Sequence, residues 1–177
     1  VFNWSIQQET PYSFMFDPTV VNGRNRAHID GGYKDDFPIT AITWLDAIAF
    51  ANALSEMEEL TPVYYEDAAR TTVFRGRKRD KNADAGNEES HLGQKIYESN
   101  VDWRAKGYRL PTESEWEKAA RGGVAGLTYA NSNTLDSKFT HYDQDTIIRS
   151  LRSVGSLEPN GFGLYDMNGN AWEMCWD

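Results

Sequence analysis

Residues 160–173, which read NGFGLYDMNGNAWE, restrict the fold of this chain more than any other segment, because carboxylates, amides and glycines stand there among large aromatic side chains. Asp166 and Glu173 supply anionic oxygens, and Gly169 lets the backbone turn so that main-chain carbonyls can also point inward. A calcium ion takes roughly six to eight oxygen ligands, so carbonyls or water must join the two carboxylates. The segment therefore predicts a small oxygen cage for calcium beside a packed core.

Two interpretations of this segment stay open on the residues alone. The helix-loop-helix calcium loop is excluded, because Gly169 stands too near Asp166 and Glu173 comes too early for that pattern. The remaining alternative to a metal cage is an Asn/Gly turn in which Asp166 and Glu173 cap backbone amides. Metal site and acidic turn are therefore the two hypotheses.

Two helices are predicted from local patterns. Apolar side chains recur at helical spacing after Thr43, which predicts an amphipathic helix over residues 44–58. Thr112 and Glu115 form a capping-box pattern ahead of a second, shorter helix. Gly122 and the glycine after it are expected to end that helix.

The remaining chain predicts short strands and long loops. Brief apolar runs at 37–42 and 63–65 are bounded by residues typical of turns, so the class is α+β. With 177 residues, of which 40% are hydrophobic, we expect one domain over 1–177. Residues 75–98 open with a basic run and continue as a polar stretch, which predicts a loop insertion that is solvated or, as the alternative, docks an acidic partner or phosphate. The large indoles of Trp116, Trp172 and Trp176 are expected to pack in the core.

Composition excludes several classes of function. The formal net charge of −9 opposes a general affinity for nucleic acid, because the averaged field repels phosphates. No apolar run of about twenty residues occurs, so no transmembrane segment is predicted. Cys175 is the single cysteine, which excludes an internal disulfide or a paired-cysteine site. His28, His91 and His141 are far apart and offer no metal-ligand spacing, so no catalytic residue is assigned.

Three blocks of the sequence resemble the formylglycine-generating enzyme family, also called sulfatase-modifying factors. NGFGLYDMNGNAWEMCWD at 160–177 is similar to the most characteristic block of the family, GYRLPTESEWEKAARGG at 107–123 to a second, and residues 37–65 to a third. The blocks appear in the order of the family. The resemblance implies the family's variant of the C-type lectin-like fold, with two helices, short antiparallel strands and much irregular loop.

The resemblance also implies ligands and a chemistry. A family calcium is bound at the positions that match the Asp166 side chain, the main-chain oxygens of Gly169 and Ala171, and the Glu173 side chain, so a structural calcium is expected here. Enzymatic members oxidise a substrate cysteine with copper held by two cysteines that follow this block, and Cys175 matches neither. The family's first strand also has no match here, so we expect the domain to be truncated at both ends.

Three functions follow from the resemblance and are ranked. The first is a non-catalytic domain that binds a protein or small-molecule ligand, such as the bacterial variable proteins of diversity-generating retroelements, with an extracytoplasmic or cell-surface location. The alternative is a copper-dependent formylglycine-generating oxidase, if the catalytic cysteines lie beyond the chain given. An iron-dependent sulfoxide-forming domain ranks last, because the three separated histidines form no iron site.

Overall fold

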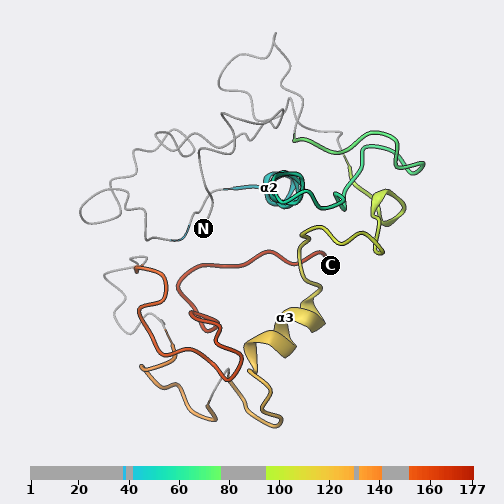
Figure 1. Ribbon diagram of the computed structural model, residues 1–177. Coiled ribbons are helices and arrows are strands. Elements are labelled where there is room, and N and C mark those ends of the chain that lie inside the picture. Colours follow the sequence, from blue (N-terminus) through green and yellow to red (C-terminus); the bar gives the residue numbers. More distant parts are fainter. Residues whose placement is uncertain (1–37, 39–41, 77–94, 130–131, 141–151) are drawn as a thin grey trace. The chain divides into compact units, whose positions relative to one another are not determined.

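The computed structural model describes residue 38 and residues 42–76, 95–129, 132–140 and 152–177 (Figure 1). In these residues it contains, in chain order, helix α2 (Trp44–Met57), the 3-10 helix η2 (Glu98–Asn100) and helix α3 (Glu113–Ala120). The chain divides into two compact units, one containing Ile42–Leu110 and the other Pro111–Asp177. A single domain over 1–177 stays a prediction.

Helix α2 begins at a capping box that satisfies donors of its first turn. The Thr43 hydroxyl accepts a hydrogen bond from the Asp46 N–H (3.2 Å), and the Asp46 carboxylate accepts one from the Thr43 N–H (2.9 Å). The Asp46 side chain is buried, and its charge lies at the positive end of the helix dipole. The start of α2 is therefore fixed by two residues of its own sequence.

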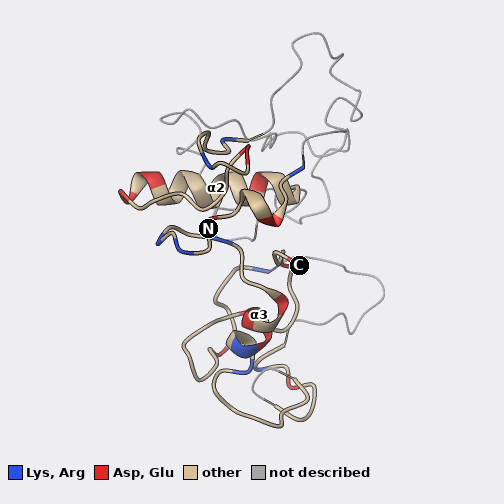
Figure 2. Ribbon diagram, turned by 90° about the vertical axis from the view of Figure 1, so that its right-hand side faces the viewer, with Lys and Arg blue, Asp and Glu red and all other residues tan. Residues whose placement is uncertain are grey.

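The end of α2 is unusual because an acidic residue occupies the left-handed position that glycine normally takes. The Leu60 N–H donates to the Ser55 carbonyl (2.8 Å) and the Glu59 N–H to the Glu56 carbonyl (3.1 Å), which is the Schellman arrangement. Glu59 has a φ of 57°. In Figure 2 the ribbon is coloured for acidic residues near both ends of α2, and the helix contains no Lys or Arg.

A buried asparagine organises the core of the Ile42–Leu110 unit. The Asn52 side-chain nitrogen donates to the Tyr64 carbonyl (2.8 Å) and the Phe74 carbonyl (2.9 Å). Its oxygen accepts from the Val63 N–H (3.0 Å) and the Tyr64 N–H (3.1 Å). Around it lie the fully buried side chains of Ile48, Val63, Tyr64, Phe74 and Val101. One helix side chain thus fixes two loop segments.

Helix α3 is fixed at its start by its own cap and by the last residues of the chain. The Thr112 hydroxyl accepts from the Glu115 N–H (3.2 Å), and the Glu115 carboxylate accepts from the Thr112 N–H (2.9 Å). The Asp177 carboxylate accepts from the Glu113 N–H (2.7 Å), at the end of the helix where anions are favoured. The Trp176 N–H donates to the Pro111 carbonyl (2.8 Å).

The structure confirms both predicted helices and modifies the strands. Residues 63–65 contribute only isolated antiparallel bridges, from Tyr64 to Val101 and from Tyr65 to Val73. Within the described ranges strand structure consists of such bridges, so the α+β prediction is confirmed for its helices and loops and not for its strands. Most of the predicted strand 37–42 and of the predicted insertion 75–98 lies outside the described residues.

Candidate functional site

The predicted calcium segment is anchored to α3 through a second buried asparagine. The Asn160 side-chain nitrogen donates to the carbonyls of Ala119 (2.7 Å) and Ala120 (3.1 Å). Its oxygen accepts from the N–H groups of Phe162 (2.9 Å) and Leu164 (3.0 Å). The start of the segment is therefore held against the last turn of α3.

Gly122 and Gly161 allow the backbone after α3 and the backbone of the predicted calcium segment to lie close together. A Cβ atom on Gly161 would lie 2.3 Å from the Gly122 carbonyl oxygen, and a Cβ atom on Gly122 would lie 2.6 Å from the Gly161 nitrogen. Gly122 also has a φ of 58°, in the region that favours glycine. The prediction that glycine follows α3 is thus confirmed, and the glycine serves packing as well as helix termination.

Asp166 lies half-buried in this segment and is tied to a neighbouring turn. Its Oδ2 atom accepts a hydrogen bond from the Gly155 N–H (2.6 Å), and its Oδ1 atom is buried. Asp166 has a φ of 58°, a left-handed conformation that Asp adopts more readily than most residues. The Asp166 carboxylate therefore faces inward and is hydrogen-bonded to the segment at 154–155.

A tight turn follows at Gly169, where φ is 102°. The Gly169 carbonyl accepts from the Ala171 N–H (2.9 Å), with Asn170 at a φ of 65° between them. The Asn170 side chain exchanges two hydrogen bonds with the Arg152 backbone, at 2.9 and 3.1 Å. The main-chain positions predicted to bind calcium therefore lie in one ordered turn.

Glu173 is exposed and is oriented by helix α3. Its Oε2 atom accepts a hydrogen bond from the Trp116 indole N–H (2.5 Å). Trp116 is half-buried, as is Trp176. The expectation that Trp172 packs in the core is wrong, because its side chain is 103% exposed. The turn at 169–171 immediately precedes Trp172, and local sequence does not tell which side of such a turn faces the core.

The donor set of this segment fits calcium in its chemistry. All the predicted ligands are hard oxygen atoms, which calcium prefers. A carboxylate offers about four lone-pair sites, so one hydrogen bond each to Asp166 and Glu173 is compatible with metal ligation. The described residues contain no group of three or more His, Cys, Asp or Glu side chains placed to hold an ion. A calcium cage here would therefore need the main-chain oxygens of Gly169 and Ala171, or water.

The two predicted carboxylate ligands are held by different segments. Asp166 is bonded to the turn at 154–155, whereas Glu173 is bonded to α3. Sequence patterns did not reveal the Trp116–Glu173 hydrogen bond or the role of Asn160. Neither interaction has a local sequence signal, because Trp116 is distant in the sequence from Glu173, and Asn160 is distant from the α3 carbonyls that it binds.

The environment of Cys175 opposes a reactive thiol. Burial, followed by the negative charges of Asp177, Glu113 and Glu173, raises the pKa of the Cys175 thiol above its ordinary value. A thiolate is the form that attacks as a nucleophile and binds soft metals, so this environment disfavours both roles. The three histidines lie outside the described residues.

In the part of the chain that the structure describes, polar side chains join two capped helices to irregular loops, and strand structure is limited to isolated bridges. Residues 8–177 match the family described as the sulfatase-modifying factor enzyme 1-like domain, and this chain belongs to that family. The family resemblance of the three sequence blocks is thereby confirmed. None of the helices found in the described residues has the length and apolar character needed to cross a membrane.

The chain is similar to proteins that carry different functional names. Chaperone protein LppX of Paenibacillus barcinonensis is 31% identical over 164 residues, which cover 82% of this chain and 54% of that protein. The formylglycine-generating enzyme of Streptomyces coelicolor is 42% identical over 87 residues, which cover 42% of this chain and 27% of that enzyme. The chain thus spans about half the length of LppX and less of the enzyme.

Among solved structures, Treponema denticola variable protein 1 superposes with a TM-score of 0.63 at 27% sequence identity. The match covers 97% of this chain and 56% of the variable protein. This likeness establishes the formylglycine-generating-enzyme variant of the C-type lectin-like fold for the chain.

Proposed function

We propose that this chain is a non-catalytic binding domain that presents side chains to a protein or small-molecule ligand on a C-type lectin-like scaffold. The observation that carries the proposal is the structural match to a variable protein along 97% of the chain. Asn52 and Asn160 support it, because loops that are fixed before binding lose little entropy when a ligand is bound. An extracytoplasmic or cell-surface location, implied by the family resemblance, forms part of this proposal.

The proposal includes one structural calcium ion. The Asp166 and Glu173 side chains and the main-chain oxygens of Gly169 and Ala171 would hold it, and its positive charge would offset their negative charge. The segment that contains them is bonded to α3 at Asn160 and again at Glu173. Bound calcium would therefore stabilise this loop against the helix.

The calcium site is tested by melting temperatures measured in calcium and in chelator. Glu173→Gln keeps an acceptor for the Trp116 indole and loses the charge, so it should melt lower than the parent in calcium and equally in chelator. Trp116→Phe is the matched control, because it removes the same hydrogen bond and leaves the carboxylate. It should lower the melting temperature by a similar amount in both solutions. A Glu173→Gln effect that is the same with and without calcium would overturn the site.

The absence of catalysis is tested by oxygen uptake. The purified protein is given copper and a peptide that contains a cysteine, and the loss of peptide thiol and the consumption of oxygen are followed together. We expect neither, because Cys175, the single cysteine, matches neither copper-binding cysteine of the family, and burial followed by the nearby carboxylates raises the pKa of its thiol. Oxygen consumption that matches the loss of peptide thiol, and that persists in Cys175→Ser, would overturn the proposal that this chain is non-catalytic.

A further inference from the structure

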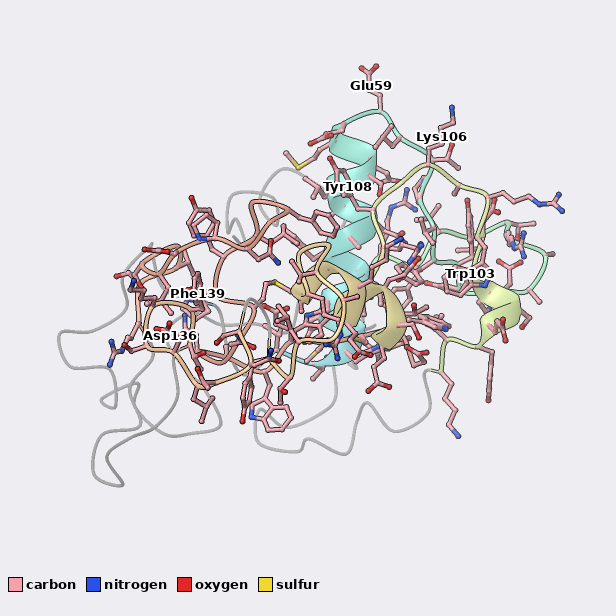
Figure 3. The ribbon with its side chains drawn as sticks, turned by 90° about the horizontal axis from the view of Figure 1, so that it is seen from below. Glu59, Trp103, Lys106, Tyr108, Asp136 and Phe139 are labelled. Carbon is pink, nitrogen blue, oxygen red and sulfur yellow. The ribbon has the colours of Figure 1, made fainter. Side chains whose placement is uncertain are left out.

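The loop at residues 103–109 is basic, in contrast to the net negative charge of the whole chain. It reads WRAKGYR and so carries three cations, two aromatic rings and no carboxylate, in a chain of net charge −9. All five of these side chains are exposed, and Trp103 and Tyr108 are 40% and 41% exposed. Figure 3 shows Trp103, Lys106 and Tyr108 along the loop beside α2. We call Trp103, Arg104, Lys106, Tyr108 and Arg109 the 103–109 surface.

The backbone of this loop is fixed to the core of its unit. The Tyr108 N–H donates to the Ser55 hydroxyl (2.7 Å), and the Leu110 N–H donates to the hydroxyl of buried Tyr64 (2.8 Å). A Cβ atom on Gly107 would lie 2.3 Å from the Thr61 carbonyl oxygen, so the loop approaches the neighbouring backbone as closely as glycine permits. The 103–109 surface is therefore ordered before any partner arrives.

Two of the neighbouring carboxylates, Asp102 and Glu58, are engaged within the protein. Asp102 lies 3.5 Å from the Arg70 guanidinium and accepts a hydrogen bond from the Arg104 N–H (3.0 Å). Glu58 accepts a hydrogen bond from the Tyr108 hydroxyl (2.7 Å). These contacts reduce the local negative potential beside the three cations of the loop.

Arg109 and Trp103 form a cation–π pair. The Arg109 Cζ atom lies 5.4 Å from the centroid of the Trp103 ring, within the range of a cation–π contact. The Arg109 guanidinium also donates to the Leu110 carbonyl (3.1 Å), and a planar guanidinium matches the two oxygens of a carboxylate. Trp, Tyr and Arg are also the residue types that most often dominate the binding energy of protein interfaces.

We infer that the 103–109 surface is a docking site for an acidic polypeptide segment of a partner protein. This inference rests on the proposed binding function and names the chemical class of the partner. Carboxylates of the segment pair with Arg104, Lys106 and Arg109, and its apolar groups contact the two aromatic rings. A short acidic segment fits better than a long nucleic acid, because it carries few negative charges, and the repulsion from the net charge of −9 grows with the number of charges on the ligand.

The test measures fluorescence anisotropy of a labelled peptide of alternating Glu and Gly residues, at low and at physiological salt. A Lys/Gly peptide of the same length and a single-stranded oligothymidine of the same charge are measured alongside. We expect the acidic peptide to bind and the double variant Arg104→Glu/Lys106→Glu to weaken binding by about tenfold or more. Trp103→Leu should weaken it by a few fold, because the support for Arg109 is lost.

The matched control is Lys138→Glu/Arg152→Glu, which changes the net charge equally at exposed positions of the other unit. It should alter the affinity by no more than about twofold. Three results would each overturn the inference. The two double variants could weaken binding equally, oligothymidine could bind more tightly than the acidic peptide, or the acidic peptide could fail to bind the parent protein. Such a failure is distinguishable from failure of the proposed function, because the calcium and oxygen-uptake assays do not depend on this loop.

Discussion

At the scale of single residues, the buried asparagines Asn52 and Asn160 hold loops that form only isolated β-bridges within the described ranges. Asn52 and Asn160 each bind two carbonyls and two N–H groups of the backbone. A primary amide has two donor hydrogens and one oxygen with two lone pairs, so four partners satisfy it completely. Each of these side chains therefore replaces several ladder hydrogen bonds and joins a helix to irregular chain.

Asn52→Ala should be strongly destabilising. It leaves the buried N–H groups of Val63 and Tyr64 and two buried carbonyls without this partner, which costs about 3 kcal/mol or more of unfolding free energy. Asn133→Ala is the control, because that exposed amide accepts one bond, from the Thr128 N–H (3.0 Å), and its loss should cost under about 1 kcal/mol. Urea denaturation measures both, and equal losses would contradict the assigned role of Asn52.

The raised pKa of buried Tyr64 predicts that the protein loses stability at alkaline pH. Burial raises the pKa of Tyr64 from its ordinary 10.0 to about 12, although the Leu110 N–H and the Arg109 charge act in the opposite direction. Between these values the unfolded chain loses the phenol proton and the folded chain keeps it, so the free energy of unfolding falls as pH rises. The contribution is complete below pH 10 and is lost towards pH 12.

The alkaline prediction is measured by urea denaturation at increasing pH. Tyr64→Phe should show a shallower decline than the parent protein, although it is less stable at neutral pH because the Leu110 N–H loses its acceptor. Tyr97→Phe alters an exposed ring and should leave the slope unchanged. Parallel slopes for the parent and Tyr64→Phe would rule out Tyr64 as the titrating group.

At the scale of elements, the turn that ends α2 contains backbone strain at Glu59, which a glycine at that position would relieve. Glu59 takes a φ of 57° in the Schellman turn, where a side chain costs about 1 kcal/mol relative to glycine. Glu59→Gly should therefore raise the free energy of unfolding. Glu59→Ala removes the same charge from the negative end of the helix but keeps the strain, so the Gly variant should exceed the Ala variant by about 1 kcal/mol. Chemical denaturation that finds the two variants equal would exclude backbone strain as the cause.

The helices could be predicted from sequence because their signals are local. Apolar spacing gave residues 44–58, against the observed Trp44–Met57, and the Thr112 and Glu115 pair marked the start of α3. The capping box at Thr43 and Asp46 follows the same pattern and could also have been read from the sequence. The bridges could not, because Tyr64 pairs with Val101, far along the chain, through single contacts.

The residue types at the candidate site could be predicted from the sequence, but the contacts that these residues make could not. The glycines and carboxylates of residues 160–173 indicated a turn with oxygen ligands, and left-handed backbone is observed at Asp166, Gly169 and Asn170. Calcium binding itself stays a prediction. The exposure of Trp172 and the bond from Trp116 to Glu173 depend on how distant segments meet, which periodicity and spacing do not encode.

At the scale of the whole molecule, the two proposed binding functions belong to different compact units. The predicted calcium ligands lie in Pro111–Asp177, whereas the 103–109 surface lies in Ile42–Leu110. Each unit has its own buried asparagine and its own capped helix. A ligand of one unit should therefore stabilise that unit first.

Amide hydrogen exchange followed by mass spectrometry tests this separation. A ligand slows only those opening reactions that destroy its site, so calcium should slow exchange in peptides from residues 152–177 and leave residues 42–76 unchanged. Sodium chloride at equal ionic strength controls for screening of the carboxylates. Glu173→Gln should abolish the protection, because it removes one anionic ligand. Equal slowing in both units would contradict a local site, and no slowing in residues 152–177 would exclude calcium from the loop that contains Asp166 and Glu173.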